Sequence, residues 1–176
     1  MKNVLAIHKK KQDNKQKKSC GKINHKKTEI DGIVFHSKLE SSFYKKLKLD
    51  KEEGRIKDFT LQPKYILQDK YIIVEGRTVY GSDKDFNKLK KKYKAETVRA
   101  IHYISDFEIE ELDGSITVVD TKGKSTADFE IKRKIFKALN PTLTFKVLTL
   151  NTKTKEWVDY YEYAKEKRKV KKKAKQ

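Results

Sequence analysis

Cysteine, proline, methionine and tryptophan are all scarce in this chain. Its 176 residues include one Cys, two Pro, one Met and one Trp. A single cysteine, Cys20, excludes an intramolecular disulfide and fits a reducing, intracellular location. No apolar run is long enough to span a bilayer, and the apolar stretch near Met1 is too short for a signal peptide. We therefore expect a cytoplasmic protein without a membrane partner.

Acidic residues are also too few to balance the basic ones. Lys and Arg number 44 and Asp and Glu 25, which gives a formal net charge of +19. Such an excess favours a polyanionic partner, and nucleic acid is the common one, because lysines that meet phosphates release condensed counterions. The alternative is a basic protein with no specific partner. A zinc site is not expected, because the available His and Cys residues lack paired spacing: they are His8, Cys20, His25 and His36.

The charge is distributed unevenly, and this predicts one folded domain with basic ends. We expect a flexible basic arm over residues 1–27, a domain over residues 28–163 and a basic tail over residues 164–176. Residues 68–96 are predicted to interrupt the domain as an insertion. The middle of the chain carries patterned Val, Ile, Leu, Phe and Tyr, whereas the ends are nearly free of large apolar residues.

The patterned region predicts an α/β fold with a central mixed sheet and helices on its faces. A helix should begin at Ser37, which forms a capping-box pattern with Glu40, and end at Gly54. Two strands, 101–109 and 116–123, should flank a hairpin turn, because their apolar residues follow strand periodicity.

A second helix is predicted over residues 128–139, and a further strand over residues 143–150. Ile131, Ile135 and Leu139 recur at intervals of four, so we expect them to form the buried stripe of this helix.

Two carboxylates and an ammonium group should meet near one end of the hairpin. Asp120 and Lys122 lie two apart on a strand, so their side chains leave the same face. Asp106 lies on the preceding antiparallel strand and reaches that face if the register is favourable. Carboxylate oxygens hold Mg²⁺ together with phosphate oxygens, and a lysine can stabilise charge developing on a phosphate. Alternatively, these acids are strand-end carboxylates paired with lysines, and Glu40 only caps its helix.

These residues carry a resemblance to the PD-(D/E)XK nuclease superfamily. The chain resembles short phage and prophage predicted endonucleases of that superfamily and, more distantly, TnsA-type and Holliday-junction-resolvase-like nucleases. The resemblance covers residues 29–150, and its motif is Glu40, Asp106 and Asp120-Thr121-Lys122. Two departures are Asp120 in place of the commoner Glu, and Ser105 in place of the proline before Asp106.

The resemblance implies a restriction-endonuclease-like core and Mg²⁺-dependent hydrolysis of DNA phosphodiesters, with Mn²⁺ able to substitute. It assigns catalysis to Glu40, Asp106, Asp120 and Lys122, with the three acids as metal ligands. It also implies DNA contacts, which would be made by Gln62, Lys124, Lys132 and Arg133. Equally, Gln62 could only hydrogen-bond to the backbone before Pro63. Lys124, Lys132 and Arg133 could form a solvated surface instead of a DNA contact.

Branched recombination or replication intermediates are the favoured substrates, because so small a domain has little means of reading a long sequence. A branched substrate would suit a homodimer, although the sequence carries no dimer signature. One alternative is a non-catalytic, basic nucleic-acid-binding protein that keeps a nuclease-like fold. Another is a basic structural protein, such as a ribosome or capsid component, in which Asp106 and Asp120 lie far apart.

Overall fold

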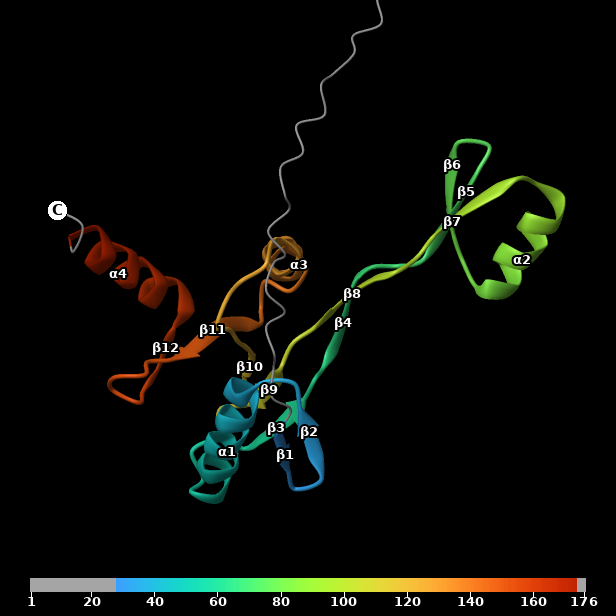
Figure 1. Ribbon diagram of the computed structural model, residues 1–176. Coiled ribbons are helices and arrows are strands. Elements are labelled where there is room, and N and C mark those ends of the chain that lie inside the picture. The colour runs from blue at the N-terminus through green and yellow to red at the C-terminus, as the bar shows by residue number, and fades with distance from the viewer. Residues whose placement is uncertain (1–27, 174–176) are drawn as a thin grey trace, which may run out of the picture.

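The computed structural model describes residues 28–173. The predicted basic arm over residues 1–27 lies outside the described residues, as do His8, Cys20 and His25. The described residues form a single mixed α/β domain with four helices and a central five-stranded sheet (Figure 1). No helix within residues 28–173 is long and apolar enough to cross a membrane.

The central sheet has the strand order β12-β11-β10-β9-β3. β10 and β11 are parallel, and the other neighbouring pairs are antiparallel, so the predicted mixed sheet is confirmed. A small hairpin of two further strands precedes the first helix. The hairpin consists of β1 (Thr28–Ile30) and β2 (Ile33–Phe35). The strands of the central sheet are β3 (Asp58–Leu61), β9 (Phe107–Glu110), β10 (Ile116–Thr121), β11 (Thr144–Leu150) and β12 (Trp157–Asp159).

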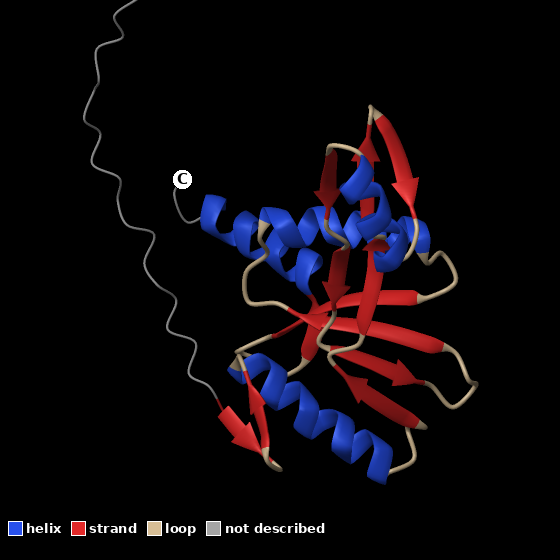
Figure 2. Ribbon diagram, turned by 90° about the vertical axis from the view of Figure 1, so that its right-hand side faces the viewer, coloured by secondary structure: helices blue, strands red, loops and turns tan. Residues whose placement is uncertain are grey.

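Two helices cover opposite faces of the sheet, and β10 lies between them (Figure 2). On one face, α1 (Lys38–Glu52) buries Phe43 and Leu47 against Val119 and the buried residues of β9. On the other face, α3 (Ala127–Leu139) packs against the neighbouring residue, Val118, and against β11. Successive residues of a strand point to opposite faces, so β10 is buried on both sides from its second residue to its last.

Helix α1 begins and ends as its sequence predicts. The Ser37 hydroxyl accepts a hydrogen bond from the Glu40 backbone N–H at 3.1 Å. The Glu40 carboxylate accepts from the backbone N–H of His36, one residue earlier than in a standard capping box. Gly54 follows the helix with φ of +67°, a left-handed conformation that glycine adopts without strain.

The buried stripe predicted for α3 is wrong. Phe129 and Phe136 are the buried residues of this helix, whereas Ile131, Ile135 and Leu139 are exposed by 60%, 36% and 54%. Both phenylalanines pack near Tyr103, so aromatic volume decides which side of the helix faces the sheet. Both stripes satisfy helical periodicity, and the pattern of isoleucines alone selects the wrong one.

The strand predicted over residues 101–109 is interrupted. β8 (Ile101–Ile104) and β9 are separated by Ser105 and Asp106, which belong to neither strand. The partner strand breaks at the same level, at Gln62-Pro63, where Gln62 has φ of +49°. Backbone hydrogen bonds still cross the break, from Gln62 N–H to the Asp106 carbonyl and from Ser105 N–H to the Pro63 carbonyl. The two-stranded ribbon formed by these partner strands therefore bends at this level, and its backbone pairing is kept.

Beyond this bend the two paired strands first pack beside α3 through Leu67 and Tyr103 and then project from the sheet. We define residues 64–104 as the arm (Figure 1). Ile72, Val74 and Phe86 form a small core of their own at its far end. Tyr71–Val74 forms a strand, and the lysine-rich segment further along forms a helix with a capping box at Ser82. The arm elements are β4 (Lys64–Gln68), β5 (Tyr71–Val74), β6 (Arg77–Tyr80), α2 (Asp83–Lys92), β7 (Ala95–Val98) and β8.

The C-terminal region is more ordered than its composition suggests. Helix α4 (Tyr160–Lys173) runs into the predicted basic tail, so the described part of residues 164–176 is helical. Its first turn is fixed to the neighbourhood of α3, because the Tyr161 hydroxyl donates to Glu130 and the Tyr160 hydroxyl accepts from Ser125 N–H, both at 2.8 Å. Tyr160 and Tyr161 therefore anchor the first turn of α4, and the lysine-rich remainder of this helix is exposed to solvent.

Candidate functional site

Asp120 is a buried carboxylate near the end of β10. It is 1% exposed in a chain of net charge +19. The Tyr103 hydroxyl donates a hydrogen bond to its Oδ2 at 2.5 Å, and the Lys122 ammonium contacts its Oδ1 in an ion pair. Lys122 is itself 24% exposed and lies over the Phe129 ring, 4.7 Å from the ring centroid. The predicted proximity of Asp120 and Lys122 is therefore confirmed.

Asp106 lies between β8 and β9, where the ribbon bends, and it is across from Asp120. The last β9–β10 pair is Phe107 with Val119, and the same register extended by one residue sets Asp106 opposite Asp120. Because β9 ends there, the next backbone N–H of β10 lacks a strand partner on that side, and Asp106 supplies one. Its Oδ2 accepts from the Thr121 N–H at 2.7 Å and from the Thr121 hydroxyl at 2.8 Å.

Glu40 and Asp106 line the same small pocket, which has a volume of about 110 Å³. Gln62 also lines it, so the break at Gln62-Pro63 brings a third polar residue to the site. The remaining lining is apolar, contributed by β2, Leu61 and Phe107. Glu40 thus meets Asp106 on the α1 side of the sheet, while Asp120 faces Tyr103 on the α3 side, and Asp106 lies between them.

Mutual repulsion and burial raise the affinity of these acids for protons. Burial raises the pKa of Asp120 to about 6, and the charge of Asp106 adds to the rise, while Lys122 and Tyr103 oppose it. Burial, followed by the charge of Asp106, also raises the pKa of Glu40. The pKa of the Tyr103 hydroxyl is raised by burial and by Asp120, so it remains a donor at neutral pH. A cation placed among these acids would relieve the same repulsion.

A hard cation fits the chemistry of these donors, although the side chains are not gathered around one point. Within residues 28–173, no group of three or more His, Cys, Asp or Glu side chains is arranged to hold a metal ion. Mg²⁺, however, takes one or two carboxylates from a protein and fills its remaining positions with water and phosphate oxygens. Asp120 Oδ1 is buried, and the Lys122 ammonium contacts it in an ion pair. Asp106 and Asp120 are thus two carboxylates of the kind that such an ion takes, and Glu40 lines the pocket beside Asp106.

The predicted DNA contacts beyond Gln62 lie around the start of α3. Lys124 is exposed in the loop before this helix, and Lys132 pairs with Asp128 at 3.2 Å. Arg133 donates to Glu130 through Nε and a terminal nitrogen and lies over the Tyr161 ring, so it fastens α4 to α3. Of these residues, only Lys124 is presented to solvent without a described acidic partner.

Two residues that position the acids escaped the sequence reasoning. Tyr103 orients Asp120, and Thr121 orients Asp106 through both its backbone and its hydroxyl. Tyr103 had a usable signal, because it lies three residues before Asp106 on an apolar strand position and a buried tyrosine needs a partner for its hydroxyl. Thr121 had none, since its role depends on the interruption of the neighbouring strand.

A family assignment follows from the sequence as a whole. A family model described as "Protein of unknown function (DUF1064)" matches residues 20–157. The chain belongs to this family. Comparisons with curated proteins and with solved structures found no match. The matched span of this DUF1064 protein includes Glu40, Gln62, Asp106, Asp120 and Lys122.

Proposed function

We propose that this DUF1064 protein is a metal-dependent DNA endonuclease with a PD-(D/E)XK site on a restriction-endonuclease-like core. The observation that carries the proposal is the buried Asp120 carboxylate, paired with Lys122 and set opposite a second acid, Asp106. A buried ion pair is weak as a stabilising device, because the desolvation of both charges offsets their attraction. Two carboxylates crowded at one strand end cost further free energy, which a catalytic role explains and a structural role does not.

Each residue would have a distinct task. Asp106 and Asp120, with Glu40, would hold Mg²⁺, which supplies Lewis-acid polarisation of the scissile phosphodiester when it is bound. Lys122 would direct its ammonium at charge developing on the phosphate, in a partly water-excluded position. Tyr103 keeps one oxygen of Asp120 oriented, and Thr121 keeps one oxygen of Asp106 oriented, so the second oxygens of both acids, including Asp120 Oδ1 beside Lys122, are preorganised.

The substrate we propose is duplex DNA, with branched recombination or replication intermediates favoured. The basic excess supports a nucleic acid in general, because a charge of +19 gives strong, sequence-independent attraction to phosphates. A homodimer would place two such sites on one branched substrate. The second candidate is a basic nucleic-acid-binding protein without catalysis, and the absence of a three-acid cluster among the described residues favours it.

The test is cleavage of linear, nicked, flapped and four-way DNA with Mg²⁺ by the full chain and by Asp120→Asn and Lys122→Gln. We expect cleavage by the wild type and a loss of about 100-fold or more in each variant. Glu52→Gln, which neutralises an exposed acid on α1, is the matched control and should cleave normally. Wild-type rates in both site variants would overturn the assignment, and tight binding without any cleavage would establish the second candidate.

A further inference from the structure

We propose that the arm is a duplex-DNA clamp whose tip contacts phosphates about one helical turn away from the cleaved bond. The inference rests on the proposed function, because it places the scissile phosphate at the Asp106 end of the arm. It assigns a role to the predicted insertion at residues 68–96, which the nuclease motif does not explain.

The charge at the arm tip, residues 69–99, is unbalanced and largely unpaired. The tip holds nine Lys or Arg and five Asp or Glu. Two of the acids are already engaged, since Asp83 pairs with Lys70 and Asp85 accepts from the backbone and hydroxyl of Ser82. Lys70 is the one basic residue of the tip that has an acidic partner among residues 28–173. The others are available to an external anion.

The end of α2 concentrates this charge. Five lysines fall within residues 88–94, and all five are exposed. The helix dipole favours a cation or two in a last turn, but like charges at this spacing repel one another. The phosphates of a nucleic acid relieve that repulsion and release counterions, so a polyanion is the partner that this surface fits.

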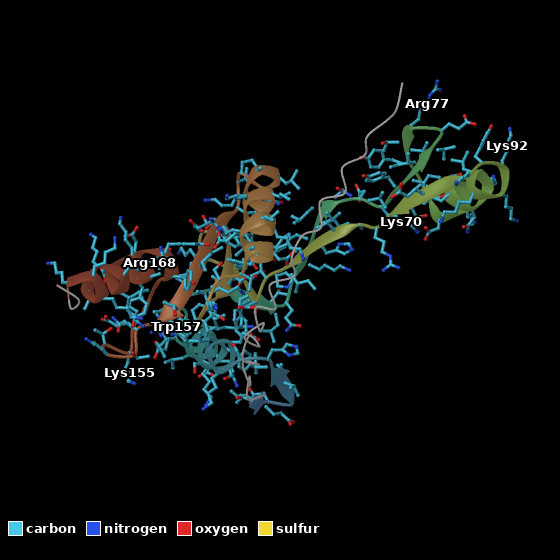
Figure 3. The ribbon with its side chains drawn as sticks, turned by 45° about the horizontal axis from the view of Figure 1, so that its top comes forward. Lys70, Arg77, Lys92, Lys155, Trp157 and Arg168 are labelled. Atoms are coloured by element: carbon cyan, nitrogen blue, oxygen red, sulfur yellow. The ribbon has the colours of Figure 1, made fainter. Side chains whose placement is uncertain are left out.

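The arm is built to hold those charges at a fixed position relative to the site. Ile72, Val74 and Phe86 form a separate small core that keeps α2 folded against β5 and β7, away from the main sheet. The ribbon that carries this core continues through the break at Gln62 and Asp106 into β3 and β9 of the central sheet. In Figure 3, Lys70, Arg77 and Lys92 lie on this projecting part, at the opposite end of the molecule from Lys155 and Arg168.

The length of the ribbon sets the expected spacing on DNA. Twelve residues separate Gln62 from Val74, and a strand rises by about 3.3 Å per residue, so the ribbon spans at most about 40 Å. Its twist and its bulge near Leu67 shorten this reach. B-DNA repeats every 34–36 Å or so, which is about 10 base pairs. A duplex that enters the site and follows the arm therefore meets the lysines of α2 about one turn away.

The test compares two triple variants of the full chain that carry the same change in charge. The arm variant is Lys88→Gln/Lys91→Gln/Lys94→Gln, which alters exposed residues without a described ion pair or aromatic partner. The matched control is Lys45→Gln/Lys153→Gln/Lys155→Gln, on α1 and the β11–β12 loop. Binding to duplexes of 8 and 20 base pairs is measured by fluorescence anisotropy across a salt series, with EDTA present so that no metal-dependent cleavage occurs.

We expect the arm variant to bind the 20-base-pair duplex about tenfold or more weakly, with a salt slope reduced by about 2 to 3. On the 8-base-pair duplex, which is too short to reach the arm tip, it should match the control. Equal losses in the two triple variants, or equal losses on both duplexes, would overturn the clamp. A larger arm-dependent loss on a 20-base-pair RNA duplex would overturn DNA as the partner. Because binding is read without cleavage, failure of the nuclease site would leave this result unaffected.

Discussion

The strand end around Asp120 and the arm tip around α2 use charge in opposite ways. At the strand end, the acids are few, Asp120 is buried and Asp106 is half-buried, and Tyr103, Thr121 and Lys122 fix them in place. At the arm tip, lysines are exposed and numerous, and a core of three buried residues supports them, against eight and six in the two main clusters. Burial allows a charge to act through precise geometry, whereas exposure allows many charges to act through number. The proposed nuclease would use both, at different places.

The first prediction separates activity from stability at the strand end. Asp120→Asn removes a desolvated charge while keeping the shape of the side chain, so we expect DNA cleavage to fall by about 100-fold or more. The melting temperature of the metal-free protein should stay the same or rise, because functional burial of a charge is costly to the fold. Calorimetry and cleavage rates on the same preparation check this. A variant that loses both would make Asp120 a structural residue.

The second prediction compares the main core with the arm core. Phe136→Ala leaves a cavity beneath α3 and should lower the global free energy of unfolding by about 3–5 kcal/mol. Phe86→Ala removes the largest side chain of the arm core and should release hydrogen-exchange protection in residues 69–99 while the sheet keeps its protection. Equal loss of protection in the sheet would show that arm and sheet unfold as one unit.

The third prediction concerns pH. The pKa of Asp120 is about 6 in the folded protein against an ordinary value of 3.8, because burial and Asp106 disfavour its charge. Between about pH 4 and pH 6 the folded protein keeps a proton that the unfolded chain has released. The free energy of unfolding should therefore fall as pH rises through this window, by about 3 kcal/mol from this group. Denaturant titrations of the wild type and of Asp120→Asn should differ by this amount.

A pH dependence that is identical in the two proteins would contradict the burial of an ionised Asp120. The same window bears on function, because carboxylates bind metal in their deprotonated form. Metal-dependent activity should thus rise as pH increases through about 6.

The fourth and smallest prediction tests Tyr103 as a positioning residue. Tyr103→Phe removes the hydrogen bond to Asp120, which should destabilise the protein by about 1.5–3 kcal/mol, as expected for a bond to a charged group. The activity profile should also shift to higher pH, because this bond lowers the pKa of Asp120. Tyr65→Phe is the matched control, since Tyr65 donates to Glu108 on the same ribbon. It should leave the pH profile unchanged.

Local signals predicted the elements, and tertiary packing decided the details. The cap at Ser37, the turn before β10 and the spacing of Asp120 and Lys122 follow from short-range rules, and the structure has all three. The interruption at Ser105-Asp106 could not be predicted, because apolar alternation resumes in phase at Phe107 and the bend depends on its partner strand at Gln62-Pro63. The role of Thr121 depends on the same break.

The orientation of α3 shows the same limit. Ile131 and Ile135 have helical spacing, as do Phe129 and Phe136, and only the aromatic cluster around Tyr103 decides between the two faces. The sequence predicts an insertion at residues 68–96, but the small core within it becomes visible only when β5 and α2 are placed together.

The proposal that Asp106 and Asp120 hold a metal ion can be tested by locating bound Mn²⁺. Crystals of the full chain soaked in Mn²⁺ would be measured for anomalous scattering, with Asp120→Asn crystals as the control. We expect one or more anomalous peaks in contact with the carboxylates of Asp106 and Asp120, and we expect these peaks to be lost in the variant. Mn²⁺ bound only at sites away from both acids, or no ordered Mn²⁺ at all, would contradict the proposal.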